Sequence, residues 1–600
     1  MSAVTSSVSV VRDTCNAYVL RSGREAVLID FGSGLVLDRL AELGVDRVTD
    51  VLVTHHHRDG VQGLARAAAA GIRIWVPPLE EELFTDVSRR WQSRQLDNDY
   101  DLREDRFSLL DDVQVTGTVA EYRTTRYGSF DVFTLPTPGH TVGSVTYLVE
   151  VDGRRVGFSG DLLYGDGKVW SLAATQWTYT GVEGLTATIL SAATLLDHRP
   201  DVLLPAHGPP IEDPPGAVVR AREGLQELLE LRRTQPLNLE RWLREPWVPL
   251  TPHLLRNRTS FGTSYALLSD SGSALLLDWG YDFASGMTWA TDKPSRRPLL
   301  TSIAALRRDH GIDRVEVVVP THFHDDHVAG INLLRDVEGT EVWAPENFAD
   351  VLERPTRYDL PCLWFDPIAV DRRLPLRAPF TWREHELTPY ALPGHTLYAA
   401  AIALDVDGRR VLATGDQQSA EDDGRSVLNY QYRNRFALGD FVASARLYLD
   451  LEPDLLLSGH WLPREVTPEL LDGLLRDAER VDELHRRLLP LDDVDFGVAG
   501  FGARVEPYRS EVAAGGAVML EVHVRNPLSS SATARVELAV PDGWEAPEPQ
   551  ELALDRGGEG VLRFEVTAGP RRERRARVGV DLTVGDVRFG QQAEALVDVA

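Results

Sequence analysis

The stretch THFHDDH, residues 321–327, decides the fold and follows the largely apolar run VEVVV, residues 315–319. The apolar run predicts a buried strand that delivers the histidines to its carboxyl end. Residues two apart in an extended chain point the same way, so His322 and His324 can approach one ion together. Because zinc accepts imidazole nitrogen and carboxylate oxygen, the stretch predicts metal ligands at the end of a strand.

The same pattern occurs twice in the chain, about 250 residues apart and in the same order. The first copy has THHHRDG at residues 54–60. Further matching pairs are Asp30 and Asp278, Trp75 and Trp343, His140 and His395, Asp161 and Asp416, and His207 and His460. The spacings differ only where loops change length, so the sequence indicates an internal duplication.

Composition and periodicity divide the chain into four segments. The first copy takes residues 1–235, a Pro-rich linker follows at 236–252, and the second copy takes residues 253–490. Residues 491–600 alternate apolar and polar positions between Gly, Pro and Asp turns. That alternation predicts an all-β sandwich as the last domain.

Three further residues of the second copy, His395, Asp416 and His460, each stand next to glycine at an apparent strand end. Glycine there permits the tight turns that direct a side chain inward. A site with several such ligands and one open position is of the catalytic type.

These residues resemble the metallo-β-lactamase fold superfamily, whose ligand order is HxHxDH followed by a lone His, a lone Asp and a lone His. The resemblance covers roughly residues 10–235 and 255–490 and implies an αββα sandwich in each copy. It implies a first metal held by His322, His324 and His395, a second metal held by Asp326, His327 and His460, and Asp416 as the bridge between them.

The first copy departs from this pattern at one position. By the same resemblance its ligands are His55, His57, Asp59, His140, Asp161 and His207. Gly60, however, stands where the motif requires histidine, and His56 should point away from His55 and His57 in an extended segment. We therefore expect the first copy to hold one metal tightly and a second metal weakly or not at all.

The resemblance implies hydrolysis by a hydroxide that two Zn²⁺ ions generate near neutral pH. A small ester, thioester, lactone or lactam is the expected substrate, cleaved mainly in the second copy. Asp326, with Asp59 as its counterpart, is the candidate catalytic residue of each copy. An insertion containing Tyr281, Phe283 and Trp289 is a candidate substrate wall, although packing against the other copy explains it equally well.

Three alternatives remain open. Ligand type alone does not distinguish zinc from iron, so an iron-dependent oxygenase on the same fold is one alternative. A nucleic-acid-processing hydrolase is another. For the first copy, a structural or regulatory role with weak or no catalysis is the third, with the two copies forming a pseudo-dimer within the chain.

Composition limits these possibilities. The 600 residues carry a formal net charge of −28, which disfavours nucleic acid as a partner because phosphate contacts need clustered Lys and Arg. No apolar run approaches the roughly 20 residues that span a bilayer, and no leader pattern opens the chain, so we expect a cytoplasmic protein without a membrane partner. Cys15 and Cys362 match no ligand and are expected to be buried thiols. The last domain weakly resembles immunoglobulin-like modules.

Overall fold

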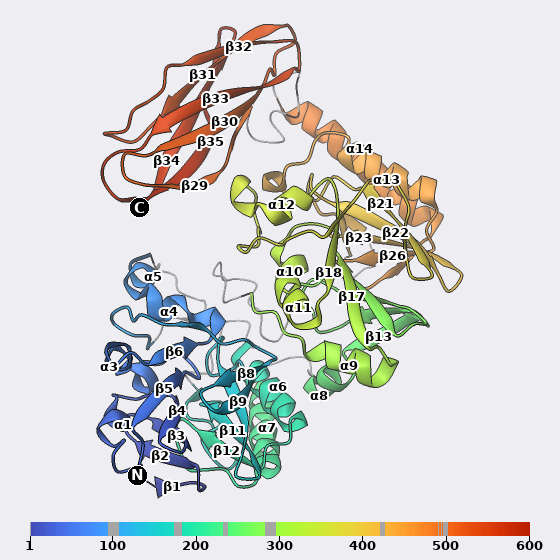
Figure 1. Ribbon diagram of the computed structural model, residues 1–600. Coiled ribbons are helices and arrows are strands. Elements are labelled where there is room, and N and C mark those ends of the chain that lie inside the picture. The colour runs from blue at the N-terminus through green and yellow to red at the C-terminus, as the bar shows by residue number, and fades with distance from the viewer. Residues whose placement is uncertain are drawn as a thin grey trace. The chain divides into compact units, whose positions relative to one another are not determined.

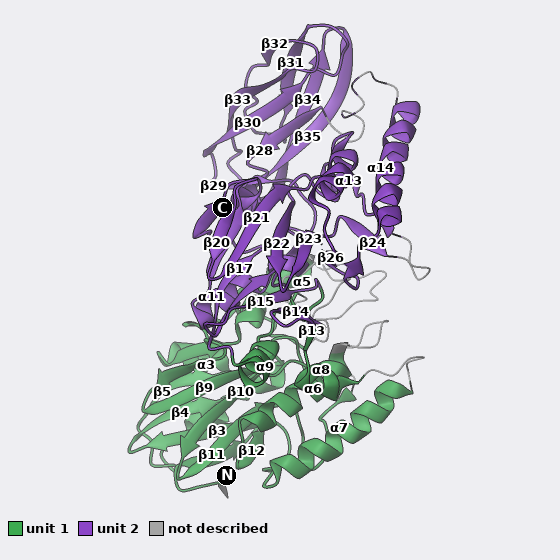
Figure 2. Cartoon of the chain, turned by 90° about the vertical axis from the view of Figure 1, so that its right-hand side faces the viewer, with its two compact units in different colours: residues 1–248, 258–261, 281–311 green, residues 249–257, 262–280, 312–600 purple. Residues whose placement is uncertain are grey.

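The computed structural model describes residues 2–93, 107–172, 183–231, 238–282, 296–420, 426–489, 491, 493, 495 and 502–600. Contacts divide the chain into two compact units, residues 1–248, 258–261 and 281–311, and residues 249–257, 262–280 and 312–600 (Figure 2). The division into four segments made in the sequence analysis is based on the repeats and not on contacts, and it stays a prediction. None of the described helices is long and apolar enough to cross a membrane.

The first repeat contains two sheets. One follows chain order and comprises β1 (Ser2–Ala3), β2 (Val8–Arg12), β3 (Asn16–Ser22), β4 (Glu25–Ile29), β5 (Arg47–Leu52), β6 (Arg73–Val76) and β7 (Gly117–Thr118). The other has the order β12 (Val202–Pro205), β11 (Arg154–Gly160), β10 (Val145–Val151), β9 (Phe130–Pro136) and β8 (Thr124–Tyr127). Strands β4 to β7 pair in parallel, as do β11 and β12, so their carboxyl ends meet at one edge.

Helices cover the outer face of each sheet in the first unit (Figure 1). The first sheet packs against α1 (Leu35–Asp38), α2 (Arg58–Val61), α3 (Leu64–Ala69), α4 (Glu82–Thr85) and α5 (Val87–Ser93). The second packs against α6 (Glu183–Asp197) and α7 (Pro214–Glu230), while α8 (Leu239–Arg244) contacts α6 and α9 (Thr301–His310). A third cluster, which includes Leu20, Ile29, Tyr147 and Phe158, fills the space between the sheets. The result is a four-layer αββα sandwich.

The second repeat has the same topology. Its first sheet runs in chain order through β13 (Trp247–Thr251), β14 (Leu254–Asn257), β15 (Tyr265–Leu268), β16 (Ser273–Leu277), β17 (Arg314–Val319), β18 (Glu341–Pro345) and β19 (Arg372–Leu374). Its second contains β20 (Phe380–Trp382), β21 (His385–Ala391), β22 (Ala400–Val406), β23 (Arg409–Gly415), β26 (Leu455–Ser458) and β27 (Arg464–Glu465), with β24 (Gln418–Ala420) and β25 (Ser426–Leu428) as a separate hairpin.

The helices of the second repeat are α10 (Asp325–Val328), α11 (Ile331–Glu338), α12 (Ala349–Glu353), α13 (Asp440–Leu451) and α14 (Pro468–Leu488). Helix α11 contacts β17 and β18, whereas α13 and α14 share a buried cluster with the second sheet. Leu277, Val319, Ile402 and Leu457 belong to the cluster between the two sheets. Both αββα repeats predicted from the sequence are confirmed.

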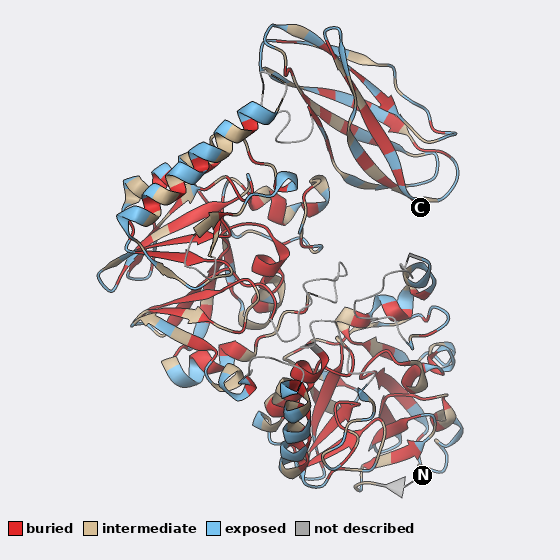
Figure 3. Ribbon diagram, turned by 180° about the vertical axis from the view of Figure 1, so that it is seen from behind, coloured by how far each residue is buried: buried red, intermediate tan, exposed pale blue. Residues whose placement is uncertain are grey.

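The last hundred residues form an all-β sandwich, as predicted. One sheet has the order β28 (Ala503–Glu506), β30 (Ala517–Arg525) and β33 (Glu559–Thr567); the other has β29 (Arg509–Val512), β35 (Val587–Val599), β34 (Glu573–Val584), β31 (Ala532–Ala539) and β32 (Gln550–Leu554). Buried and exposed positions alternate along these strands (Figure 3). The buried positions form a cluster of their own, and the resemblance to immunoglobulin-like modules stays a prediction.

The prediction of two buried thiols is half wrong. Cys15 is buried, but Cys362 is exposed. Cys362 lies in a turn with φ 54°, and its carbonyl accepts a hydrogen bond from Asp325 N at 2.8 Å. The turn therefore docks through its backbone, and the Cys362 side chain lies outside the core.

Phe564 offers a test of whether the sandwich is stabilised by its own core. Its side chain is 1% exposed within that cluster, so Phe564→Ala should lower the free energy of unfolding of the sandwich by about 3–5 kcal/mol. Met519→Ala, at a residue 50% exposed on β30, is the matched control and should cost far less. Urea denaturation of the full chain measures both effects. Equal losses in the two variants would contradict the assignment of the core.

Candidate metal centres

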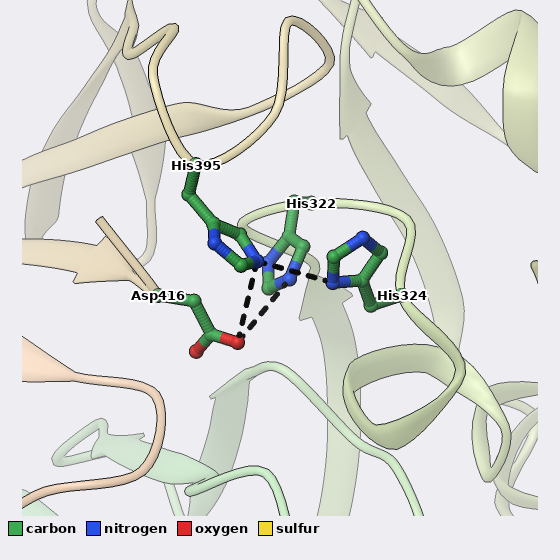
Figure 4. A group of neighbouring side chains, drawn as sticks. All are labelled: His322, His324, His395 and Asp416. Atoms are coloured by element: carbon green, nitrogen blue, oxygen red, sulfur yellow. Dashed lines mark hydrogen bonds and ion pairs between the residues drawn. The ribbon is translucent and has the colours of Figure 1, made fainter. Parts of the chain in front are cut away.

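The carboxyl ends of three strands bring four ligand candidates of the second repeat together (Figure 4). His322 and His324 follow β17, His395 follows β21, and Asp416 follows β23. One nitrogen or oxygen atom of each of these residues lies within 4.8 Å of the others. We name this group of His322, His324, His395 and Asp416 cluster A.

A second group shares one member with cluster A. Asp326, His327, Asp416 and His460 form cluster B, again with ligating atoms within 4.8 Å of one another. His460 Nε2 lies 3.0 Å from Asp326 Oδ2 and 3.1 Å from Asp416 Oδ2, and His327 Nε2 lies 3.3 Å from Asp416 Oδ1. The structure thus brings together all seven residues that the motif order selected, with Asp416 common to both clusters.

Hydrogen bonds to asparagine residues orient two of the three imidazoles of cluster A. His395 Nδ1 donates to the Asn429 carbonyl at 2.8 Å, and His324 Nε2 contacts Asn434 Oδ1 at 3.2 Å. The opposite nitrogens, His395 Nε2 and His324 Nδ1, then face each other at 3.3 Å. Outer hydrogen bonds that orient each imidazole in this way are typical of metal-ligating histidines.

The donor atoms of both clusters fit a divalent cation. Within the described part of the chain, His322 Nε2 is buried and makes no hydrogen bond, and His327 Nε2 and Asp416 Oδ1 form an ion pair at 3.3 Å without a hydrogen bond. Buried polar atoms without partners are costly, and imidazole nitrogen with carboxylate oxygen is the ligand chemistry that zinc accepts. His322, His324, His395 and Asp416 would hold one ion, and Asp326, His327 and His460 would hold a second with Asp416 between them.

Burial and neighbouring charge set the protonation of these groups. Desolvation lowers the pKa of His322 well below its usual value and that of His324 to about 3, so both imidazoles are neutral ligands. Burial opposes charge on His460, yet the Asp416 and Asp326 carboxylates raise its pKa to about 10. Against the same burial, His327 and His460 hold the pKa of Asp326 at about 2, which keeps that carboxylate ionised.

Asp278 is a functional residue to which the sequence analysis assigned no role. It follows β16 in a left-handed conformation, φ 59°, which is rare for a residue with a side chain. Its carboxylate accepts hydrogen bonds from Thr321 N at 2.6 Å, from Thr321 Oγ1 at 2.9 Å and from His327 Nδ1 at 2.9 Å. Asp278 therefore orients His327, and its recurrence as Asp30 was the signal that could have revealed it.

The first repeat forms a smaller cluster. His55, His57 and His140 have ligating atoms within 4.8 Å of one another, and Asp161 Oδ2 lies 3.6 Å from His55 Nε2 and 3.4 Å from His140 Nε2. Burial lowers the pKa of all three histidines well below the usual value. We name His55, His57 and His140 cluster C; its three imidazoles would hold one ion.

The other predicted ligands of the first repeat pair with each other. His207 Nδ1 lies 3.0 Å from Asp161 Oδ2, and His207 Nε2 lies 3.4 Å from Asp59 Oδ2. His56 Nδ1 lies 3.2 Å from the buried Glu80 carboxylate, and its ring packs edge-on against His57 with centroids 4.8 Å apart. His56 thus lies beside cluster C without joining its group of ligating atoms. Gly60 lies in α2 and provides no side chain.

Asp30 occupies the position of Asp278 but has no histidine to orient. It has φ 55° and accepts hydrogen bonds from Thr54 N at 2.8 Å and from Thr54 Oγ1. Burial raises its pKa to about 7, although the hydrogen bonds from Thr54 oppose the shift.

The candidate substrate wall is described only at its start. The Tyr281 ring stacks on Phe261 with ring centroids 5.4 Å apart, and Arg296 lies over the Tyr281 ring. Phe283 and Trp289 lie outside the described residues. The role of this loop stays a prediction.

Buried imidazoles and carboxylates at the strand ends of an αββα sandwich define a class of metal-binding proteins. The family model described as the metallo-beta-lactamase superfamily matches residues 10–207 and 258–460, so the chain belongs to that superfamily.

Curated relatives are distant and only partly covered. The chain is 26% identical over 236 residues to an atrochrysone carboxyl ACP thioesterase of Aspergillus chevalieri, covering 38% of this chain and 63% of the relative. It is 31% identical over 133 residues to a hydroxyacylglutathione hydrolase of Methylobacterium nodulans, covering 22% of this chain and 40% of the relative. The chain thus spans less than two thirds of the length of either relative.

Similar solved structures include metallo-β-lactamases. That of Cronobacter sakazakii has 17% sequence identity and a TM-score of 0.31 and covers 41% of this chain and 97% of its own. A subclass B3 enzyme of Bradyrhizobium japonicum has 18% identity and a TM-score of 0.30 and covers 42% of this chain and 98% of its own.

Asp278→Asn should weaken the affinity of cluster B for zinc by about 10–100-fold, because His327 loses the acceptor that orients it. Competition with a chromophoric chelator measures the affinity of the full chain. Asp30→Asn is the matched control, since Asp30 holds Thr54 but no histidine, and it should leave zinc affinity unchanged. Equal weakening by both substitutions would contradict an orienting role for Asp278.

Asp30 should make stability depend on pH. In the unfolded chain an aspartate titrates near pH 4, whereas in the folded protein Asp30 keeps its proton to about pH 7. Between these values the folded state holds the extra proton, so the free energy of unfolding falls as pH rises, by at most about 4 kcal/mol. Asp30→Asn cannot titrate and should become more stable relative to wild type between pH 5 and pH 8. Urea denaturation of the metal-free chain tests this; a difference independent of pH would refute it.

Proposed function

We propose that the protein is a zinc-dependent hydrolase whose chemistry is carried mainly by clusters A and B of the second repeat. The observation that supports this most directly is the sharing of Asp416 by two adjacent groups of buried donors. Two cations held by clusters A and B would supply hydroxide near neutral pH and would polarise the carbonyl under attack.

The residues of this chain have separable tasks in that reaction. Asp326 is ionised at neutral pH and 12% exposed in its side chain, so it can accept a proton or orient a water at the open side of cluster B. His322 and His324 stay neutral in a water-poor pocket. Asp278 and Asn429 keep His327 and His395 in the tautomers that turn Nε2 toward Asp416.

An acyl thioester is the substrate class that we propose first. The curated relatives include a thioesterase and a hydroxyacylglutathione hydrolase, which are both named for acyl hydrolysis. Esters, lactones and lactams pass through a similar tetrahedral state in which negative charge develops on the carbonyl oxygen, so they belong in the same screen.

The first repeat is proposed to hold one metal in cluster C and to contribute little turnover. Its three imidazoles suit one ion, while His207 pairs with both Asp59 and Asp161. A structural or regulatory role follows for this repeat.

Zinc-loaded full chain should hydrolyse at least one compound in a screen of acyl thioesters, esters, lactones, β-lactams and phosphodiesters. Asp326→Asn should lower kcat/KM by about 10²–10⁴-fold, because cluster B loses a charged oxygen and the candidate proton acceptor. Asp405→Asn, which removes the same charge at a carboxylate 77% exposed, should leave kcat/KM unchanged. His55→Ala with His57→Ala should remove one metal and retain most of the turnover.

Three results would overturn the proposal. Turnover that requires iron and consumes oxygen would make the protein an oxygenase. Activity confined to phosphodiesters would move it to nucleic-acid processing. Full activity in Asp326→Asn, with activity lost in the His55 and His57 variant, would place catalysis in the first repeat.

A further inference from the structure

Backbone hydrogen bonds identify which residues of the two repeats correspond around His327. Trp279 N donates to the His327 carbonyl at 2.7 Å, and Phe31 N donates to the Gly60 carbonyl at 2.9 Å. His327 and Gly60 therefore occupy the same place in the fold.

The same comparison pairs two further positions. Thr263 N donates to the Gly459 carbonyl, as Asn16 N donates to the Ala206 carbonyl at 2.7 Å. Gly459 thus corresponds to Ala206. The residues that precede the two donors, Gly262 and Cys15, also correspond.

In the second repeat both of these glycines lie against the imidazole of His327. A Cβ atom at Gly262 would lie 3.0 Å from His327 Nε2 and 2.4 Å from the Asp326 carbonyl oxygen. A Cβ atom at Gly459 would lie 2.7 Å from His327 Cε1 and 1.9 Å from Asp416 Oδ1. Any larger residue at either position would therefore collide with a ligand of cluster B.

In the first repeat all three positions change together. The histidine becomes Gly60, and the two glycines become Cys15 and Ala206, which are 3% and 2% exposed. Cys15 Sγ lies 4.0 Å from the Gly60 carbonyl oxygen. Gly280, whose Cβ would meet the backbone of Asp326 rather than an imidazole, keeps glycine as Gly32. The exchange is thus confined to the surroundings of the missing ring.

The last histidine of the motif also differs in orientation between the two repeats. In the second repeat His460 presents Nε2 to the carboxylates of Asp326 and Asp416. In the first, His207 presents Nδ1 to Asp161, its Nε2 lies 3.2 Å from the Thr14 carbonyl oxygen, and its ring stacks on Trp170 with centroids 4.4 Å apart. His207 is therefore held by protein groups next to Cys15.

We infer that Cys15 and Ala206 take the space that the outer edge of the His327 ring, its Nε2 and Cε1 atoms, occupies in the second repeat, so that packing closes the second metal position of the first repeat. A Cβ at Gly60 would meet no atom within 4 Å, so the obstruction lies at the edge of the ring and not at its base. An added ring is not tolerated where other side chains already occupy the space of its outer atoms. Among the described residues, no group of ligating atoms within 4.8 Å includes Cys15. The Cys15 side chain therefore contributes volume to this position and is not a metal ligand. The inference rests on the proposal that clusters A to C bind divalent cations.

Zinc content of the full chain, from native mass spectrometry and elemental analysis, tests this. Wild type should hold three ions. Gly60→His alone should still hold three, since a Cβ has room at Gly60 but Cys15 and Ala206 occupy the space of the outer ring atoms. The triple variant Gly60→His/Cys15→Gly/Ala206→Gly should hold four, and adding His207→Ala should return it to three. Cys15→Gly alone should stay at three.

Four ions in Gly60→His alone would overturn the inference, because packing would then be no barrier. A lost ion in Cys15→Gly would overturn it by making Cys15 a ligand. A folded triple variant with no gain over wild type would also overturn it. Failure of the proposed function is read separately, from a wild-type chain that takes up no zinc or hydrolyses nothing in the screen.

The reverse exchange keeps the test decisive if the triple variant does not fold. Gly262→Cys should lower the Tm and remove one ion, because the new side chain meets His327. His327→Gly added to Gly262→Cys should recover part of the lost Tm while zinc content stays at the lower value. Strictly additive changes in Tm, which indicate that the two sites do not interact, would contradict the inference.

Discussion

The shared carboxylate of Asp416 is the constraint on which the second repeat depends. It closes cluster A on one side and cluster B on the other, so both groups need the loop after β23 in one conformation. Gly415 at φ 53° and Gly459, which has no room for a Cβ beside Asp416 Oδ1, permit that conformation. A bound cation would complete the buried ligand atoms that make no hydrogen bond, and the surrounding αββα sandwich supplies the rigidity that holds them in place.

The duplication lets one copy serve as a control for the other. Both repeats keep the aspartate in the left-handed conformation after the fourth strand of the first sheet, the threonine that it holds, and three converging histidines. They differ where the second cation would lie, and several differences occur there together. In the first repeat a ligand histidine is replaced by glycine, two glycines are replaced by larger residues, and the last histidine of the motif has a different orientation. Such coordinated change is expected when a buried ring and the residues against its outer edge have to fit one another.

Asp30 shows the electrostatic counterpart of that change. In the second repeat the equivalent carboxylate contacts an imidazole, whereas in the first Asp30 accepts hydrogen bonds from Thr54, and burial raises its pKa to about 7. A buried carboxylate that has no imidazole partner adds a free-energy cost of desolvation, which packing alone does not reveal. The first repeat therefore differs from the second in charge as well as in ligand number.

The sequence by itself determined the two αββα repeats, the all-β sandwich and the grouping of the ligands of clusters A to C, because these features are written in short motifs at strand ends and in strand periodicity. Only the tertiary structure decided the hydrogen bond of Asp278 to His327, the close approach of Gly262 and Gly459 to that ring, the pairing of His56 with Glu80 and the exposure of Cys362. These properties depend on which distant residue lies a few ångströms away. Local sequence patterns do not carry that information, since contacts between remote segments form only when the sheets pack.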